Sequence, residues 1–257
     1  MSKVDTLRDI VYINGNLHEQ YFITHGIEFR EFFHSIPTPL ANVLLLKHGY
    51  EESDYDFGVH LDYVENEQLP RLVEEDVSKY GDFCWVDFDE PSSFELLHDE
   101  DLAALLYLGH YKKPLRTAFS HKLNNQFVYL SSEDGWFNKT YYRNIYDMNH
   151  IVSRVIPMKL SVTKQSRFTF LKKKLEYPPV PLVLVNTLLT LANDGLVVDL
   201  KQVQQTRKDI QIPIFTIGKY IDMEEMLHDL EESSHKGSFQ ATLVLNKKDL
   251  EWELIEM

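Results

Sequence analysis

Short apolar runs separated by polar turns dominate the first third of the chain. Residues 10–13 are apolar and lead into Asn14-Gly15, and residues 21–23 form a second extended run. This pattern predicts a hairpin with its turn at Asn-Gly. The runs 43–46 and 83–86 are apolar on both faces and therefore predict buried strands.

Apolar residues at helical spacing lie between and after these strands. The helices that they predict cover 29–36, 67–80, 92–109 and 145–156, and the segment 47–66 is interpreted as an acidic loop. Ser92 and Glu95 have capping-box spacing at the start of the third helix, and Pro157 is expected to end the fourth. A second hairpin is predicted between these two helices, from 126–131 and 136–143.

Prolines at 178, 179 and 181 predict a stiff linker in the second half of the chain. The elements predicted beyond it are a helix at 182–192, a strand at 212–217, a helix at 222–232 and a terminal hairpin from 241 to 254. Hairpins with interspersed helices indicate an α+β fold with mixed or antiparallel sheets. The predicted organisation is a larger α+β domain (1–157), a basic, Pro-rich connector (158–180) and a smaller α+β domain (181–257), or a single continuous domain.

The 257 residues have an ordinary globular composition, with 44% apolar and 26% charged residues. No apolar run is long enough to span a membrane, and acidic residues near the start exclude a secretory signal. Cys84 is the only cysteine, so no intramolecular disulfide can form. We therefore expect a soluble cytoplasmic protein with no membrane partner.

The formal net charge of −14 is unevenly distributed. Residues 51–101 carry two basic and 18 acidic side chains, whereas residues 102–175 carry 13 basic and three acidic ones. Either the two segments lie side by side in the fold and neutralise each other, or each one binds a partner of opposite charge. The acidic segment would suit a basic protein.

Aromatic residues are interleaved with the cations of the basic segment, as in grooves that bind single-stranded nucleic acid or other polyanions. No nucleic-acid-binding motif accompanies them, so nucleic acid is not the favoured partner. The candidate anion-binding residues are Lys112, Lys113, Arg116, Lys139, Arg143, Arg167 and Lys172.

Asp87, Asp89 and Glu90 follow a predicted buried strand and are the candidate ligands for Mg²⁺, which prefers carboxylate oxygens. The sequence does not place a third group beside the Asp-x-Asp pair, so a solvated strand end is the alternative. None of the 11 histidines forms a metal-binding motif, and nothing around Cys84 indicates a nucleophile. Glycine-rich phosphate loops are absent, so we expect no nucleotide cofactor and assign no catalytic residue.

Residues 80–88 (YGDFCWVDF) and 134–139 (DGWFNK), within a likeness that extends along the chain, resemble an uncharacterised family of soluble proteins from Gram-positive bacteria. That resemblance implies a bacterial cytoplasmic protein and supplies no activity. The run 126–156 also resembles the closing section of immunity-type protein-binding domains, at the level of the fold alone.

Three hypotheses follow. The first is a non-enzymatic interaction or regulatory protein that binds a basic partner through the acidic segment 51–101. The second is a metal-dependent enzyme that uses Asp87, Asp89 and Glu90. The third is a polyanion-binding protein that uses the basic segment 102–175.

Overall fold

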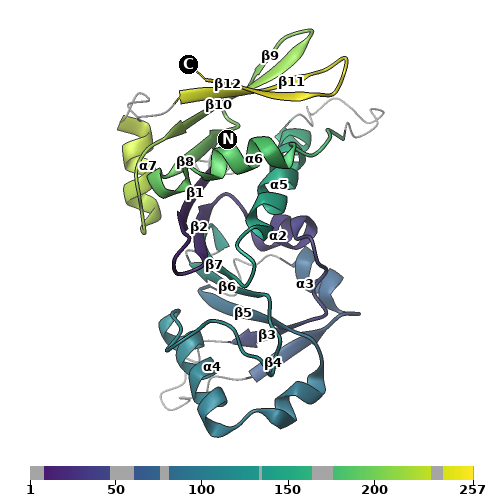
Figure 1. Ribbon diagram of the computed structural model, residues 1–257, viewed down its shortest axis with the longest axis vertical. Coiled ribbons are helices and arrows are strands. Elements are labelled where there is room, and N and C mark those ends of the chain that lie inside the picture. The colour runs from purple at the N-terminus through teal and green to yellow at the C-terminus, as the bar shows by residue number, and fades with distance from the viewer. Residues whose placement is uncertain are drawn as a thin grey trace.

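A single antiparallel sheet of twelve strands forms the framework of the protein (Figure 1). The computed structural model describes residues 9–46, 61–75, 81–132, 135–163, 176–232 and 240–256. The strand order is β12-β11-β10-β8-β1-β2-β7-β6-β5-β3-β4, and β9 pairs with β10 outside this path. The α+β prediction, with its hairpins and interspersed helices, is confirmed.

The strands are β1 (Ile10–Asn16), β2 (Tyr21–His25), β3 (Asn42–Leu46), β4 (Leu61–Glu65), β5 (Phe83–Phe88), β6 (Phe127–Ser132), β7 (Phe137–Tyr142), β8 (Leu196–Asp199), β9 (Gln204–Gln205), β10 (Asp209–Thr216), β11 (Gln240–Asn246) and β12 (Trp252–Glu256). The helices are α2 (Phe29–Ser35), α3 (Leu69–Glu74), η2 (Pro91–Leu96), α4 (Asp99–Tyr111), α5 (Asp147–Thr163), α6 (Leu182–Leu189), η4 (Ala192–Asp194) and α7 (Met223–Glu232).

Helices cover the two faces of the sheet differently (Figure 1). On one face, α2, α3, α5 and α6 bury a large apolar cluster that includes Phe32, Leu72, Ile151 and Leu188. On the other face, α4 covers the end near β4 and α7 covers the end near β12, and each buries a smaller cluster. The ends of the sheet lie at β4 and β12.

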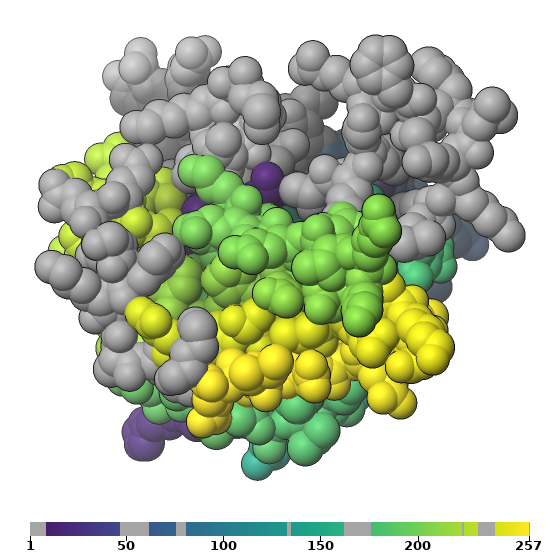
Figure 2. All heavy atoms as spheres, turned by 90° about the horizontal axis from the view of Figure 1, so that it is seen from above, coloured from purple at the N-terminus to yellow at the C-terminus, as the bar shows by residue number. Residues whose placement is uncertain are grey.

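The sheet runs without interruption through both of the predicted domains. β8 pairs with β1 on one side and with β10 on the other, so the C-terminal strands extend the N-terminal sheet. Trp252 of β12 also donates a 2.9 Å hydrogen bond from Nε1 to the carbonyl of Pro178. Seen from the β12 end, the final strands (yellow) lie beside the green residues that precede them in the chain (Figure 2).

The turn of the first hairpin was predicted wrongly. Asn14 and Gly15 lie inside β1, where Gly15 pairs with Phe22, and the chain turns at residues 17–20. A Cβ atom on Gly15 would stand 2.7 Å from the Phe22 ring. The glycine is therefore needed for close cross-strand packing and not for the positive φ of a turn.

Two predicted helix boundaries were also wrong. The Ser92–Glu95 pair does not begin the long helix, because η2 occupies Pro91–Leu96 and α4 starts with its own capping box between His98 and Asp101. The predicted 67–80 helix ends earlier, since Glu75 already has extended backbone angles; residues 76–80 lie outside the described part of the chain.

Pro157 does not end its helix, because α5 continues through it to Thr163. A proline inside a helix leaves the carbonyl four residues earlier without an N–H donor. Here that carbonyl belongs to Ser153, and the backbone N–H of Val180 donates to it at 2.9 Å. A tertiary hydrogen bond thus replaces the missing helical one.

Candidate functional site

Asp87, the first of the candidate metal ligands, already has its carboxylate engaged. It is buried at the end of β5, where its oxygens accept the backbone N–H of Gln126 at 3.0 and 2.9 Å and that of Phe127 at 2.6 Å. Burial raises the pKa of Asp87 to about 6, against the opposing effect of these donors. Through these hydrogen bonds the Asp87 carboxylate connects β5 to the start of β6.

Asp89 and Glu90 point to solvent just beyond Asp87. Asp89 accepts a 2.7 Å hydrogen bond from the Asn124 side chain, and Glu90 accepts one of 3.3 Å from Ser92. Within the described residues, no group of three or more His, Cys, Asp and Glu side chains is placed to hold a metal ion. Asp54 and Asp56, which could have added carboxylates, lie outside those residues.

Asn42 joins the ends of three neighbouring strands. Its side chain donates 2.6 Å and 3.4 Å hydrogen bonds to the carbonyls of Asp89 and Phe88, and its Oδ1 accepts the N–H of Asn66 at 3.3 Å. Asn42 also pairs with Phe88 of β5 and with Glu65 of β4. The acids that follow β5 are therefore held at the same end of the sheet as those that follow β4.

β4 is the outermost strand at this end, and sequence patterning missed it. It pairs with β3 along one side, and no strand of the described chain pairs with its other side. In an antiparallel edge strand, alternate residues direct their N–H and C=O groups away from the neighbour. The signal that could have found it is the alternation of Leu61 and Tyr63 with Asp62, which is obscured by the acids around it.

An aromatic patch lies along this open edge. Tyr63 is 41% exposed, and its ring packs against Phe88 and Phe94 with centroids 5.7 and 5.4 Å apart. Leu96, at the end of η2, is 61% exposed. Val64, on the other face of β4, packs against the large apolar cluster. The edge strand is thus anchored on one face and presents apolar surface on the other.

Exposed carboxylates surround the open edge. We call this surface the acidic end, and it consists of Asp62, Glu65, Glu67, Asp89, Glu90 and Glu95. Within the described residues, Glu65, Glu67 and Glu95 take part in no ion pair, and Arg71 is the sole lysine or arginine of the stretches 61–75 and 81–111. The local field is therefore strongly negative.

The candidate anion-binding residues are spread out, and three of the seven already interact with other groups of the protein. Lys112 forms an ion pair with Asp82 and donates to the Ser131 carbonyl at 3.1 Å. Lys139 lies 3.9 Å above the Tyr21 ring. Arg143 donates to the carbonyls of Asn125 and Ser120.

Lys113 and Arg116 are exposed in the loop after α4, whereas Arg167 and Lys172 lie outside the described residues. Lys122, which was not among the candidates, pairs with Asp101 at 2.7 Å. Within the described residues, the basic and acidic segments therefore meet at the ion pairs Lys112–Asp82 and Lys122–Asp101, neither of which involves Glu65, Glu67 or Glu95 of the acidic end.

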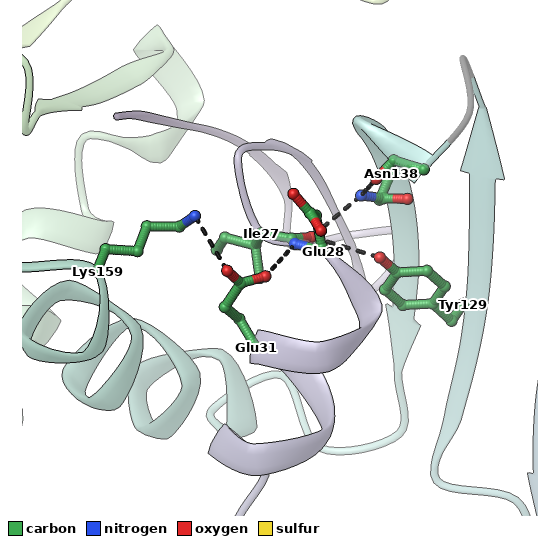
Figure 3. Close-up of polar contacts among 7 residues, drawn as sticks. Ile27, Glu28, Glu31, Tyr129, Asn138 and Lys159 are labelled. Carbon is green, nitrogen blue, oxygen red and sulfur yellow. Dashed lines mark hydrogen bonds and ion pairs between the residues drawn. The ribbon is translucent and has the colours of Figure 1, made fainter. Parts of the chain in front are cut away.

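A buried polar cluster fixes the N-terminus of α2 (Figure 3). The Ile27 carbonyl accepts hydrogen bonds from Asn138 at 3.1 Å and Tyr129 at 3.4 Å. Glu31 accepts the N–H of Glu28 at 2.9 Å through one oxygen and pairs with Lys159 of α5 at 3.2 Å through the other. Both carboxylate oxygens of Glu31 are thus occupied, which makes this cluster a clamp between α2, α5 and the sheet.

Cys84 faces the cluster beneath α4 and is fully buried. Burial raises the pKa of its thiol well above the usual value, which disfavours the reactive thiolate. The side chain packs as a small apolar residue.

No helix in the described part of the chain has the length and apolarity that crossing a membrane requires. A search of family models, of curated proteins and of solved structures finds no match to this chain.

Proposed function

We propose that this protein is a non-enzymatic interaction protein, and that its acidic end binds an extended basic segment of a partner protein. The observation that carries the proposal is the coincidence, at β4, of an open strand edge, the exposed Tyr63 ring and the carboxylates of Glu65 and Glu67, which form no ion pair within the described residues. Addition of a strand to such an edge supplies main-chain hydrogen bonds, and alternate side chains supply specificity. Lysine or arginine in the added strand would meet the carboxylates.

The opposite edge of the sheet is a weaker site for the same partner. β12 carries exposed Glu253 and Glu256, so it too is acidic. However, the neighbouring turn contains Lys247 and Lys248, and the N–H of Lys247 donates to the carbonyl of Lys208 at 2.8 Å. These cations repel a basic strand, whereas Arg71, the lysine or arginine nearest to β4 in the stretch 61–75, is paired with Glu75 at 3.8 Å. The lone, reduced Cys84 supports a cytoplasmic setting for the complex.

The test is binding of a labelled peptide of about ten residues in which lysine alternates with valine, measured by fluorescence anisotropy at low salt. The test variant is Glu65→Lys/Glu67→Lys, and the matched control is Glu253→Lys/Glu256→Lys. Each variant changes the net charge of −14 by the same amount, so only the location differs. We expect about tenfold weaker binding for the β4 variant and less than about a twofold change for the β12 variant.

A second peptide separates strand addition from simple attraction. Prolines in place of the valines keep the charge but remove half of the backbone donors. We expect this peptide to bind at least about tenfold more weakly than the valine peptide. Equal losses in both protein variants, equal affinity of the two peptides, or no binding of the valine peptide by the wild-type protein would overturn the proposal.

A further inference from the structure

A cleft of about 610 Å³ lies between the N-terminal half of α4 and the loop that follows this helix. Its floor is apolar and includes Leu105 and Leu108, which are 7% and 3% exposed. Ala103 and Ala104 of α4 and Ala118 of the loop also line the cleft, and their short side chains occupy little of its volume. The volume is within the usual range for small-molecule sites, roughly 300–1,000 Å³.

The loop wall of the cleft is held in place by buried hydrogen bonds. Asn125, which is fully buried, donates to the Ala118 carbonyl at 3.1 Å and accepts the Ser120 N–H at 2.8 Å. Arg143 donates to the carbonyls of Asn125 and Ser120 at 2.8 and 3.3 Å. The cleft is therefore preformed and does not depend on a ligand to order it.

Two hydroxyl groups of the lining, those of Ser120 and Thr117, already accept hydrogen bonds through their oxygens. The hydroxyl oxygen of Ser120 accepts the N–H groups of Lys122 and Leu123 at 3.2 and 3.4 Å, and that of Thr117 accepts the N–H of Phe119 at 3.2 Å. Since both oxygens already accept, their hydroxyl hydrogens remain to be donated.

The charges of the lining leave one guanidinium available. Lys122 balances the charge of Asp101, whose Oδ2 accepts hydrogen bonds from the Lys122 ammonium and the His98 N–H at 2.7 and 2.9 Å. Arg116 is exposed on the loop wall and forms no ion pair within the described residues. A guanidinium presents a planar set of donors that suits a carboxylate.

We infer that this cleft binds a small amphipathic carboxylate, whose apolar chain lies on Leu105, Leu108 and Ala104 and whose carboxylate pairs with Arg116. The hydroxyls of Thr117 and Ser120 supply further donors. Glu100, the remaining acid of the lining, disfavours an anion placed next to it, so the carboxylate is directed to the loop wall rather than to the helix. The inference does not depend on the peptide site at β4.

Octanoate is a suitable probe, with octan-1-ol and octylamine as neutral and cationic matches of the same chain length. Their dissociation constants can be measured by titration calorimetry or by chemical-shift changes. We expect octanoate to bind at least about tenfold more tightly than either match, because the charged hydrogen bond to Arg116 is lost in both.

Two exposed cations of the same loop give a matched pair of variants. Arg116→Gln is expected to weaken octanoate binding about tenfold, whereas Lys113→Gln, which removes the same charge outside the cleft, should change it less than about twofold. Ala104→Leu should fill the floor and abolish binding of the apolar chain. The inference is overturned if octylamine binds as well as octanoate, if Arg116→Gln binds like the wild-type protein, or if octanoate does not bind.

Discussion

Ser153 and Val180 exchange two hydrogen bonds across 27 residues of sequence. The Val180 N–H donates to the Ser153 carbonyl at 2.9 Å, and the Ser153 hydroxyl donates to the Val180 carbonyl at 2.5 Å. Both side chains are buried, and Val180 belongs to the large apolar cluster. The end of the predicted Pro-rich connector is therefore docked on α5 at the point where Pro157 leaves a carbonyl free.

This exchange predicts the effect of Ser153→Ala. Loss of the hydroxyl leaves the buried Val180 carbonyl without its donor, so the free energy of unfolding should fall by about 1–2 kcal/mol in urea denaturation. Thr187→Ala is the control, since its exposed hydroxyl donates only to the Val183 carbonyl within α6. The control should change stability by less than about 0.5 kcal/mol. Equal effects of the two substitutions would show that the Ser153–Val180 contact does not stabilise the fold.

The Glu31–Lys159 pair predicts a larger loss. Their side chains are 18% and 9% exposed, so Lys159→Met leaves a largely buried carboxylate without its counter-charge. We expect this substitution to lower the free energy of unfolding by about 2 kcal/mol. Arg71→Met removes the exposed Arg71–Glu75 pair, whose atoms are 3.8 Å apart, and should cost less than about 0.5 kcal/mol. Similar losses for both would contradict a clamp at α2.

Asp87 predicts a specific dependence of stability on pH. The pKa of Asp87 is about 6 in the folded protein and 3.8 in the unfolded chain. Between these pH values the folded state therefore binds more protons than the unfolded state does. Protonation of Asp87 therefore adds to the free energy of unfolding at low pH. This added stability, of up to about 3 kcal/mol, is lost as the pH rises from about 4 through 6. The measurement is the difference in unfolding free energy between wild type and Asp87→Asn at pH 4 and pH 7. A difference that stays constant would rule out this titration.

Substitution by alanine should lower the free energy of unfolding by different amounts at Gly26 and at Gly81. Both have positive φ angles, of 76° and 58°, but a Cβ atom on Gly26 would lie 2.0 Å from the Ile10 carbonyl oxygen, whereas one on Gly81 would meet no atom of the described residues within 4 Å. Gly81→Ala should cost about 1 kcal/mol. Gly26→Ala should cost more than about 3 kcal/mol, since the backbone must move. Thermal unfolding distinguishes them, and equal shifts would refute the clash.

The strands that are apolar on both faces could be predicted because their pattern is local. β3 and β5 lie where the runs 43–46 and 83–86 indicated, and the three predicted hairpins were placed correctly apart from the first turn. β4 was missed because the acids around it obscure its alternation, and β8 and β9 were missed because runs of four and two residues are too short for a pattern to show. β8 has four residues and joins the two halves of the sheet through β1 and β10.

The acidic character of the candidate site could be predicted from the sequence, but the open strand edge beside it could not. The count of acids pointed to residues 51–101, but the open edge arises only because β4 pairs with β3 alone. Of the Mg²⁺ candidates, Asp89 and Glu90 follow β5 as expected, whereas Asp87 lies inside this strand and accepts hydrogen bonds from the backbone of Gln126 and Phe127. These donors come from nearly 40 residues further along the chain, so no local pattern could reveal them.

The central claim, that a basic strand pairs with the open edge of β4, is tested most directly by amide hydrogen exchange of the whole protein with and without a saturating amount of the lysine–valine peptide. The account predicts that alternate amides of β4, those directed away from β3, exchange at least about tenfold more slowly in the complex, while the amides of β12 keep their rates. Unchanged exchange throughout β4 in the saturated complex, or slowing at β12 instead, would contradict it.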